Sequence, residues 1–383
     1  MNYYHPQEEN WRFPNCPKVG EDIPWVEIES YLPWTEDMKN TPQDKKHHAE
    51  GNAWIHTKMT CEELIKLDEW KNASEYERNL LFAAMLFHDV GKPETTKIEG
   101  DKITSFKHPI IGAKKIRQFL MEQNTPFYTR ELIFNFVYLH MLPITFILRD
   151  YPMFSVIKSS MVLPNNLLAL IAEADIRGRI CENLSESKEI IEYFQIYCNE
   201  NDCWDSPKKF ISDNQRFRYF AERDDCLTYD RPEKIKGKVT MLSGLQGVGK
   251  DYLIKQQFPQ LPFIGTDIIR ERMGVKFGKK EGEIQQELKE TCKEYMRKRQ
   301  DFIFNGTNLI KNNRMKWIRL FRDYNYQIEI HYVEKPLNVI FYQNKNREAV
   351  VPEGIIWDKI KNLDVPTNLE CHNIFYHVNQ KAS

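Results

Sequence analysis

The sequence predicts two domains of different fold class, an all-α helical domain followed by an α/β domain with a parallel sheet. The chain has 383 residues, which is more than one typical domain. From about residue 44 to residue 200, apolar residues recur three and four positions apart, and strand-like alternation is nearly absent. After about residue 230, short β-rich runs alternate with helical patterns, as they do in parallel sheets. We therefore expect one domain over residues 1–229, including a linker after residue 200, and another over 230–383.

Separate apolar runs account for the helices of the first domain, behind a start rich in Pro and Trp that we expect to wrap irregularly over a surface. The predicted helices cover residues 61–71, 77–89, 110–123, 130–142 and 164–179. In the second domain, the predicted strands lie within residues 237–244, 261–267, 301–308 and 327–335, and helices cover residues 314–324 and 336–348. Acids and bases alternate through residues 279–300, which favours a solvated amphipathic helix over a nucleic-acid contact.

The composition is that of a globular protein, with 41% hydrophobic and 28% charged residues. The formal net charge is -1, so any nucleic-acid contact must come from local patches. The eight cysteines form no CxxC pair, which indicates reduced thiols and a cytoplasmic protein. The first ten residues lack the pattern of a secretory signal. The longest uncharged stretch, residues 132–148, is shorter than a spanning helix, so we expect a buried helix that ends near Pro143 and no membrane anchor.

The predicted helix over residues 77–89 ends in His88-Asp89, directly before Gly91-Lys92-Pro93. A single histidine on a helix is usually structural, but further histidines and a carboxylate lie at the ends of the other helical runs. Such side chains can converge in a bundle core and hold two divalent metals, with Asp89 shared between them. The expected metal ligands are His56, His88, Asp89, His108, His140 and Asp175.

This order of residues resembles the HD phosphohydrolase superfamily over about 120 residues. The stretch HHAEGNAWIHT, residues 47–57, also resembles the opening of the HD domain attached to some tRNA nucleotidyltransferases. The resemblance implies a two-metal site that polarises a phosphate ester and activates a water molecule. Asp89 and Lys92 would then be catalytic, with Lys92 adding positive charge beside the phosphoryl oxygens. His48 could contact substrate, although His47, His48 and Arg177 fit plain surface positions equally well.

A second motif follows the first predicted strand of the α/β domain, where Gly244-x-x-x-x-Gly249-Lys250 precedes a helical pattern. This is the P-loop arrangement, in which backbone N–H groups and a helix N-terminus bind phosphates and the lysine reaches the transferred group. We expect Gly244, Gly247, Gly249 and Lys250 to bind a nucleotide. Asp251 replaces the usual Ser or Thr that holds Mg²⁺, and although a carboxylate can also coordinate Mg²⁺, its role is open.

Polar residues at the ends of the next two strands suggest the reaction. Asp267 can accept the proton of an attacking hydroxyl, besides capping a helix, and Arg270 can anchor a neighbouring phosphate. The following strand ends in Asn305, with Thr307 and Asn308 as candidate substrate contacts.

These landmarks resemble the polynucleotide 5′-kinase branch of P-loop phosphotransferases over most of residues 238–370. Lys345 and Arg347 precede a Val-Pro segment that looks like the lid of small kinases. The resemblance implies that Lys250 and Arg347 stabilise the developing charge, that Asp267 is the general base and that Arg270 contacts a nucleic-acid phosphate. Gln343 departs from a double-arginine lid pattern, so a plain surface position for Arg347 stays open.

The two motifs together resemble the bacterial HD-Pnk family, which heals broken RNA ends. The resemblance implies phosphorylation of a 5′-OH by ATP or GTP with Mg²⁺, and metal-dependent hydrolysis of a 2′,3′-cyclic phosphate and of the remaining 2′-phosphate. A histidine-rich site should prefer Mn²⁺, Co²⁺ or Ni²⁺. The expected partners are RNA ends, with DNA also possible, and a separate ligase downstream.

Two alternatives belong to other classes. The chain could be an HD nucleotidase or cyclic-nucleotide phosphodiesterase fused to a P-loop kinase for a small metabolite. A nucleotide-regulated RNA-binding module with degenerate sites is disfavoured, because both sets of candidate site residues are complete.

Overall fold

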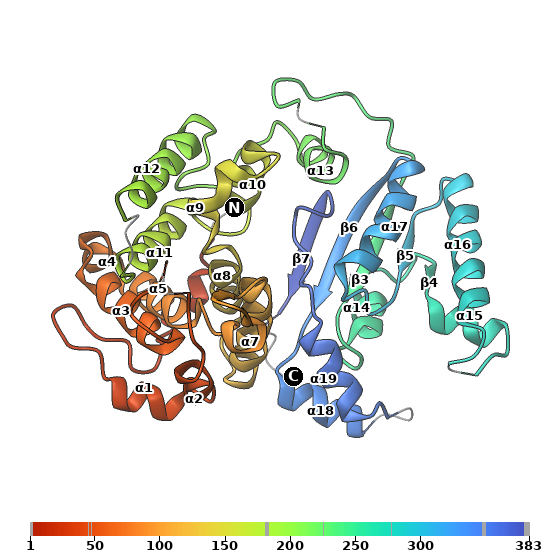
Figure 1. Ribbon diagram of the computed structural model, residues 1–383. Helices are drawn as coiled ribbons and strands as arrows, with labels where there is room; N and C mark the ends of the chain where they lie inside the picture. Colours follow the sequence, from red (N-terminus) through yellow and green to blue (C-terminus); the bar gives the residue numbers. More distant parts are fainter. Residues whose placement is uncertain are drawn as a thin grey trace. The chain divides into compact units, whose positions relative to one another are not determined.

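The computed structural model describes residues 3–44, 46, 48–180, 184–224, 226–276, 278–346 and 350–378. The chain divides into two compact units, Met1–Lys209 and Phe210–Ser383. The first is built mainly of helices, and the second contains a five-stranded parallel sheet flanked by helices (Figure 1). The predicted order of an all-α region followed by an α/β domain is confirmed.

The division between the units falls between Lys209 and Phe210 rather than near residue 230. The reason is a helix within the expected linker, α13 (Asp213–Glu222), which packs into the α/β unit. Its Arg216 donates from Nε to the carbonyl of Asn368 at 3.2 Å, and Phe217 is part of the core under the sheet. The linker composition did not reveal these contacts, which join residues far apart in the chain.

The predicted helical runs of the first unit form helices close to their expected places, and α5 lies at their centre. Ser74 and Glu77 form a capping box at its start, and Leu80 to Phe87 are all buried. An all-round apolar helix of this kind belongs in a core. The helices of this unit are α1 (Trp25–Tyr31), α2 (Thr35–Lys39), α3 (Ala53–Lys66), α4 (Asp68–Asn72), α5 (Glu75–Phe87), α6 (Lys92–Thr95), α7 (His108–Glu122), α8 (Phe127–Leu139), α9 (Leu142–Thr145), α10 (Pro152–Ser160), α11 (Asn165–Arg177) and α12 (Leu184–Glu200), with 3-10 turns at Pro6–Glu8 and Phe146–Leu148.

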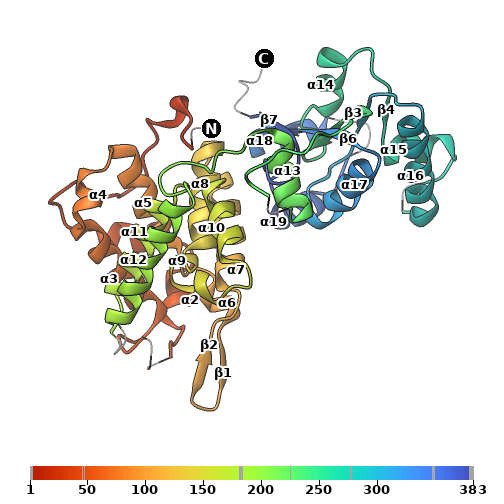
Figure 2. The ribbon, with the colours of Figure 1, turned by 90° about the horizontal axis from the view of Figure 1, so that it is seen from above.

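Three local features differ from expectation. The start of the chain contains α1 and α2 rather than only irregular structure. A small antiparallel hairpin, β1 (Lys97–Glu99) and β2 (Lys102–Thr104), projects from the helices (Figure 2). Helix α8 ends at Leu139, before Pro143, and the chain turns helical again in α9.

The stretch Phe127–Leu148 is long and apolar enough to cross a membrane by length and composition. Core helices of globular proteins pass the same test, and one such stretch is weak evidence of a membrane span. In this fold Ile133, Phe136 and Phe146 are fully buried against neighbouring elements. The segment therefore contributes to the core of the helical unit.

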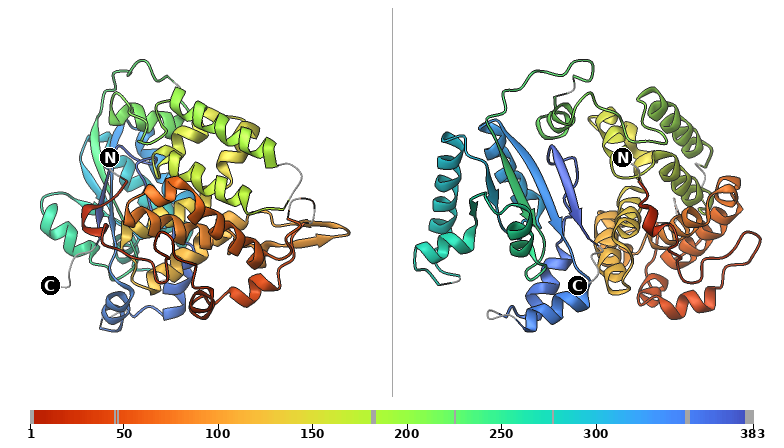
Figure 3. Two further views of the ribbon diagram at one scale, coloured as in Figure 1. Left: turned by 90° about the vertical axis from the view of Figure 1, so that its left-hand side faces the viewer. Right: turned by 180° about the vertical axis from the view of Figure 1, so that it is seen from behind.

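The α/β unit has a sheet of strand order β4-β5-β3-β6-β7, with every neighbouring pair parallel. Helix α14 covers one face, and α13 and α17 cover the other (Figures 2 and 3). The strands are β3 (Gly237–Ser243), β4 (Phe263–Ile264), β5 (Phe302–Phe304), β6 (Tyr326–Val333) and β7 (Asn373–His377), and the remaining helices are α14 (Lys250–Gln257), α15 (Thr266–Arg272), α16 (Glu281–Arg297), α17 (Lys311–Asp323), α18 (Leu337–Lys345) and α19 (Glu353–Lys361). Because β3 is central and its neighbours β5 and β6 follow it in the chain on opposite sides, ligands are expected at its carboxyl end.

Helix α16 has the amphipathic character that its alternating charges predict. Ile284, Leu288, Cys292 and Met296 recur every four residues and are buried, whereas most of the intervening side chains are exposed. The charged cluster is therefore the outer face of a packed helix.

Candidate active sites

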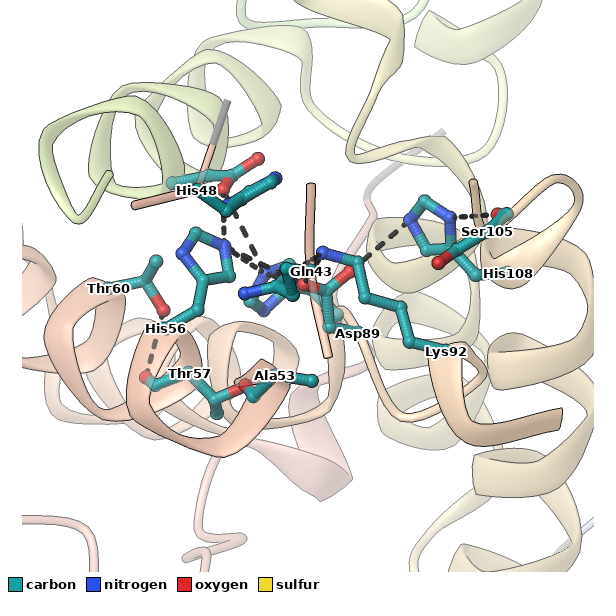
Figure 4. A network of polar contacts seen from close by, with 12 residues as sticks. Gln43, His48, Ala53, His56, Thr57, Thr60, Asp89, Lys92, Ser105 and His108 are labelled. Carbon is teal, nitrogen blue, oxygen red and sulfur yellow. Dashed lines mark hydrogen bonds and ion pairs between the residues drawn. The ribbon is translucent and has the colours of Figure 1, made fainter. Parts of the chain in front are cut away.

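The candidate ligands of the helical unit lie together in its buried centre. Figure 4 shows His56, Asp89 and His108 directed towards one another, with Lys92 beside Asp89. The ligand atoms fall into two groups, each with its atoms within 4.8 Å of one another. The first group is His56, His88 and Asp175, and the second is Asp89, His108 and His140.

Asp89 connects the two groups. Its Oδ2 lies 3.2 Å from Nε2 of His88, and its Oδ1 lies 3.2 Å from Nε2 of His108. Although burial alone would raise the pKa of Asp89, the nearby His88 and Lys92 hold it well below its usual value. The geometry is that of an ionised carboxylate offering one oxygen to each of two cations.

Hydrogen bonds at Nδ1 orient the imidazole rings. The Nδ1 atom of His88 lies 2.7 Å from the carbonyl of Met85, and that of His140 lies 2.8 Å from the carbonyl of Val137. The last carbonyls of a helix lack the usual N–H partner four residues on, so they can accept these bonds, and that of Met85 also accepts the backbone N–H of His88 at 3.4 Å. His108 makes the equivalent contact with the carbonyl of Ser105 at 2.8 Å. Each ring therefore points Nε2 into the cluster, as metal-ligating histidines do.

The spacing of these Nε2 atoms fits a pair of cations. Nε2 of His108 lies 3.2 Å from Nε2 of His140, and Nε2 of His88 lies 3.4 Å from that of His56. With the proton on Nδ1, the Nε2 lone pairs of the two rings in each pair face one another and repel. A cation bound between the two rings would remove this repulsion. Burial, together with the neighbouring His108 and His88, lowers the pKa of His140 to about 3, so this ring is neutral as a ligand must be. Buried imidazoles with carboxylates suit divalent transition metals.

Charged and polar side chains surround the cluster, and some of them escaped the sequence analysis. Lys92 places Nζ 2.6 Å from Oδ2 of Asp89 and also donates to Gln43. Arg179 pairs with Asp175, with 3.1 Å between Nε and Oδ1. Both Gln43 and Arg179 were missed, although Arg179 lies only four residues after Asp175, just beyond the end of α11.

His47, His48 and Arg177 fitted plain surface positions in the sequence. Of the two that the structure describes, one lies at the cluster and one lies away from it. Arg177 pairs with Glu173 at 2.5 Å on an exposed face, as its plain surface reading expects. His48 lies at the cluster, and its Nδ1 is 2.8 Å from Oε1 of Glu50. His47 lies outside the described residues.

Glu50 is a buried carboxylate that the sequence analysis also missed. The same Oε1 atom is 2.8 Å from Nδ1 of His56, and Oε2 accepts the backbone N–H of Ile180 at 3.0 Å. Glu50 therefore positions His56 through an ion-pair contact, without the hydrogen-bond geometry that the backbone carbonyls give the other rings. Its position within the HHAEG stretch was the available signal.

Replacing Glu50 with glutamine should weaken metal binding at the cluster by about 10- to 100-fold, because the carboxylate that orients His56 is lost. Titration calorimetry with Mn²⁺ on metal-stripped protein measures this affinity. Glu69→Gln, at an exposed position of α4, is the matched control and should bind as the parent does. Equal affinity in the Glu50 and Glu69 variants would contradict the role of Glu50.

The loop after β3 has the backbone that a phosphate-binding loop requires. Gly244, Gly247 and Gly249 have φ angles of 150°, 77° and 96°, in the region that favours glycine. A Cβ at Gly244 would lie 2.4 Å from the carbonyl of Val333, so no other residue fits there. Lys250 begins α14 and its Nζ donates to the carbonyl of Leu245 at 2.7 Å, which holds the ammonium over the loop. These positions agree with the P-loop predicted for residues 244–250.

Of the polar residues beyond the loop, Asn305 follows β5 and contacts the first turn of α14, directly after the loop. Asn305 donates from Nδ2 to Oδ1 of Asp251 at 2.9 Å. Asp267 lies in the first turn of α15 with 95% of its side chain exposed, and Nη1 of Arg270 is 2.7 Å from its Oδ1. The structure thus pairs the candidate base with the candidate phosphate anchor. Arg270 also reaches Glu281 at 3.1 Å.

Thr307 and Asn308 make contacts that build the loop. The carbonyl of Thr307 accepts the N–H of Gly244 at 2.9 Å. Asn308 has a φ of 43° and donates from Nδ2 to the carbonyl of Leu242 at 2.7 Å. Because these groups hold β3 and its loop in place, a contact with substrate stays a prediction for both residues.

The lid is described only in part. Arg347 lies outside the described residues. Lys345, at the end of α18, places Nζ 3.8 Å from Oε1 of Glu353.

Arg314 fixes the segment that supports the loop. It is fully buried and forms a two-pronged pair with Glu370, at 2.9 and 3.0 Å. Its Nη1 also donates to the carbonyls of Asn308 and Asp364, each at 2.8 Å. A buried charge is stable only when an ion pair and hydrogen bonds satisfy its polar atoms, as they do here. Arg314 therefore ties the chain after β5 to the segment that follows α19.

Comparisons with known proteins agree with the two sites. Residues 54–175 match the HD domain family, and residues 239–364 match an AAA domain family. The HD match spans the six cluster residues, from His56 to Asp175, and the AAA match spans the loop at 244–250. No curated protein matches the chain.

Among solved structures, a sugar kinase from a Janibacter species is 15% identical and aligns over 37% of this chain and 85% of its own, with a TM-score of 0.28. A score this low carries no argument about substrate. The chain therefore carries a region similar to the HD domain family, followed by a region similar to an AAA domain family, and the P-loop motif lies in the second region.

Proposed function

We propose that this protein is a bifunctional enzyme of the HD-Pnk type that heals broken RNA ends. The α/β unit would phosphorylate a 5′-OH from a nucleoside triphosphate. The helical unit would open a 2′,3′-cyclic phosphate and remove the remaining phosphate. The observation that carries the proposal is the presence in one chain of two separate sites suited to phosphate, the Asp89-centred cluster and the loop at 244–250.

In the helical unit, two bound divalent metals would polarise the phosphate ester and activate water. Asp89 positions its two oxygens for both cations, and the oriented histidines complete the set. Lys92 offers a positive charge beside Asp89, where it can turn towards a phosphoryl oxygen.

In the α/β unit, the γ-phosphoryl group passes from the nucleotide to the 5′ oxygen, and a nucleoside diphosphate leaves. The loop N–H groups and Lys250 stabilise the charge that develops on the phosphoryl oxygens. Asp267 accepts the proton of the 5′-OH, because its carboxylate is exposed at the end of the sheet. Arg270 keeps this carboxylate paired and can bind the adjacent nucleic-acid phosphate.

RNA ends fit this pair of activities for a chemical reason. Cleavage of RNA by attack of its own 2′-OH leaves a 2′,3′-cyclic phosphate on one fragment and a 5′-OH on the other. A ligase that joins a 3′-OH to a 5′-phosphate needs both ends converted. We infer that a separate ligase acts on the product.

The test is a short RNA carrying a 5′-OH and a 2′,3′-cyclic phosphate, incubated with ATP or GTP and either Mg²⁺ or Mn²⁺, Co²⁺ or Ni²⁺. We expect 5′ labelling with Mg²⁺ and 3′-end hydrolysis with the transition metals. Asp267→Asn should remove only the labelling. An RNA left untouched while free nucleotides and small metabolites turn over would refute the proposal.

Asp251 should make nucleotide binding unusually dependent on metal, because its carboxylate repels bare phosphates and attracts a cation beside them. Asp251→Asn should bind ATP in EDTA about fivefold more tightly, and should lose affinity for the Mg²⁺ complex by a similar factor. Fluorescence titration with a labelled ATP analogue measures both constants. Glu287→Gln, at an exposed position of α16, is the control. An unchanged ratio of the two constants would show that Asp251 does not face the phosphates.

A further inference from the structure

The ligand cluster of the helical unit is closed to solvent at its centre and partly open at its edges. The side chains of His56 and Asp89 are 1% and 2% exposed. His108, His48 and Arg179 keep 13%, 13% and 15% of their side-chain area exposed. A phosphate ester therefore approaches the cluster past His108 or past His48 and Arg179.

The turn before His108 is firmly held. The carbonyl of Ser105 accepts the backbone N–H of His108 at 3.2 Å and lies 2.8 Å from its Nδ1. The hydroxyl of Ser105 lies 2.8 Å from that of Thr96, which donates to the carbonyl of Lys92. Lys107 has a φ of 67°, a left-handed conformation that is uncommon for a lysine and is retained where the surrounding contacts impose it.

This same turn displays an aromatic ring to solvent. Phe106 is 78% exposed, and Nζ of Lys107 lies 5.4 Å from the centre of its ring. Among the described residues, Lys107 has no carboxylate within ion-pair distance. Single exposed apolar side chains are common on protein surfaces. Phe106 differs from these because it stands two residues from a cluster ligand, on a turn that the ligand's own hydrogen bonds make rigid.

We propose that Phe106 is a stacking surface for a nucleobase of the RNA end whose terminal phosphate lies in the cluster, and that Lys107 contacts the backbone phosphate of that nucleotide. Proteins bind single-stranded nucleic acid by this combination of an aromatic face and a cation. The proposal rests on the proposed function and adds a specificity element, because a phosphate ester without a neighbouring base gains nothing from Phe106. The turn between β2 and α7 thus selects polynucleotide ends over small esters.

The experiment compares hydrolysis of an oligonucleotide 2′,3′-cyclic phosphate with that of bis(p-nitrophenyl) phosphate by the full-length protein loaded with Mn²⁺. A lost stacking contact worth about 1 kcal/mol corresponds to about a fivefold rise in KM for the oligonucleotide in Phe106→Ala. Its kcat should be unchanged, because contacts remote from the reacting bond contribute equally before and during the reaction. Phe106→Trp, which keeps an aromatic face at this position, should have the same KM as the parent protein. Fluorescence of 2-aminopurine near the 3′ end, quenched on stacking, gives a binding readout independent of turnover.

Ile98→Ala is the matched control, because Ile98 is 63% exposed on the hairpin that precedes this turn but has no aromatic face. It should leave the oligonucleotide KM unchanged. An equal KM rise for the Phe106 and Ile98 variants, or an equal effect of Phe106→Ala on both substrates, would refute stacking while the proposed function stands. A parent protein that hydrolyses the small ester but neither binds nor hydrolyses the oligonucleotide would refute the proposed function, and the stacking proposal with it.

Discussion

Replacing Asp89 with alanine is expected to abolish hydrolysis of a 2′,3′-cyclic phosphate end and to leave 5′ phosphorylation intact. Asp89 is the side chain that places an oxygen in each group of candidate ligands, so its loss affects both cation positions at once. We expect kcat/KM to fall at least about a thousandfold, or about 4 kcal/mol of transition-state stabilisation. Gel analysis of the 3′ end of a labelled RNA measures the loss, and elemental analysis of the purified variant should show reduced metal content.

The variant also leaves Lys92 buried without its partner, so its folding must be verified. Asp89→Asn keeps the volume of the side chain and removes the charge, and retained 5′ phosphorylation shows that the α/β unit is intact. Circular dichroism reports on the helices of the first unit. Glu94→Gln, which alters an exposed acid near Asp89, should hydrolyse as the parent does. Parent-level hydrolysis by a well-folded Asp89→Asn protein would show that the cluster is not the hydrolytic site.

Lys250→Ala is expected to remove 5′ phosphorylation and to spare hydrolysis at the 3′ end. The ammonium of Lys250 lies over the loop, within hydrogen-bonding distance of the carbonyls of Gly244 and Leu245 at 3.0 and 2.7 Å, and can turn to the transferred phosphoryl group. Removing one such preorganised donor lowers kcat by about a hundredfold to a thousandfold. Transfer of label from γ-labelled ATP to a 5′-OH oligonucleotide measures the rate.

Lys255→Ala provides the comparison, because Lys255 is an exposed lysine on the same short helix, α14. It should phosphorylate at the parent rate. If the two lysine variants lost activity equally, the effect would come from the helix and not from the loop. If neither lost activity, phosphoryl transfer would have to occur elsewhere in the chain.

The residues that the sequence analysis assembled into the metal cluster lie at helix ends, where residue type and position are both visible in the chain. The cluster could be predicted because His56 precedes one recognisable apolar run, and His88 and Asp175 lie towards the ends of two others. The HHAEG stretch indicated that Glu50 belongs to the site, but its contact with Ile180, 130 residues away, could not be predicted. Gln43 contacts Lys92 from 49 residues away along the chain, and this contact could not be predicted either.

The strands also differ in whether their sequence was enough to predict them. β3 and β6 are the longest strands, β3 ending in a buried run and β6 rich in β-branched and aromatic residues, and they were predicted where they lie. β7 is short and no residue in it is fully buried, so its sequence carries little signal. β1 and β2 are mostly exposed and lack the apolar alternation that marks a strand packed on a core. The early domain boundary depends on contacts of α13 that only the fold reveals.

The Nδ1 contacts of His88, His108 and His140 have a consequence for the metals themselves. Each ring takes its direction from a backbone carbonyl, so hydrogen bonds of the chain itself hold the rings against the repulsion of their facing Nε2 atoms. Removal of bound ions should therefore leave the ligand side chains in place and the fold of the helical unit intact. Such a site could lose its divalent metals and bind others, and the metals bound would then depend on which ones the surroundings supply.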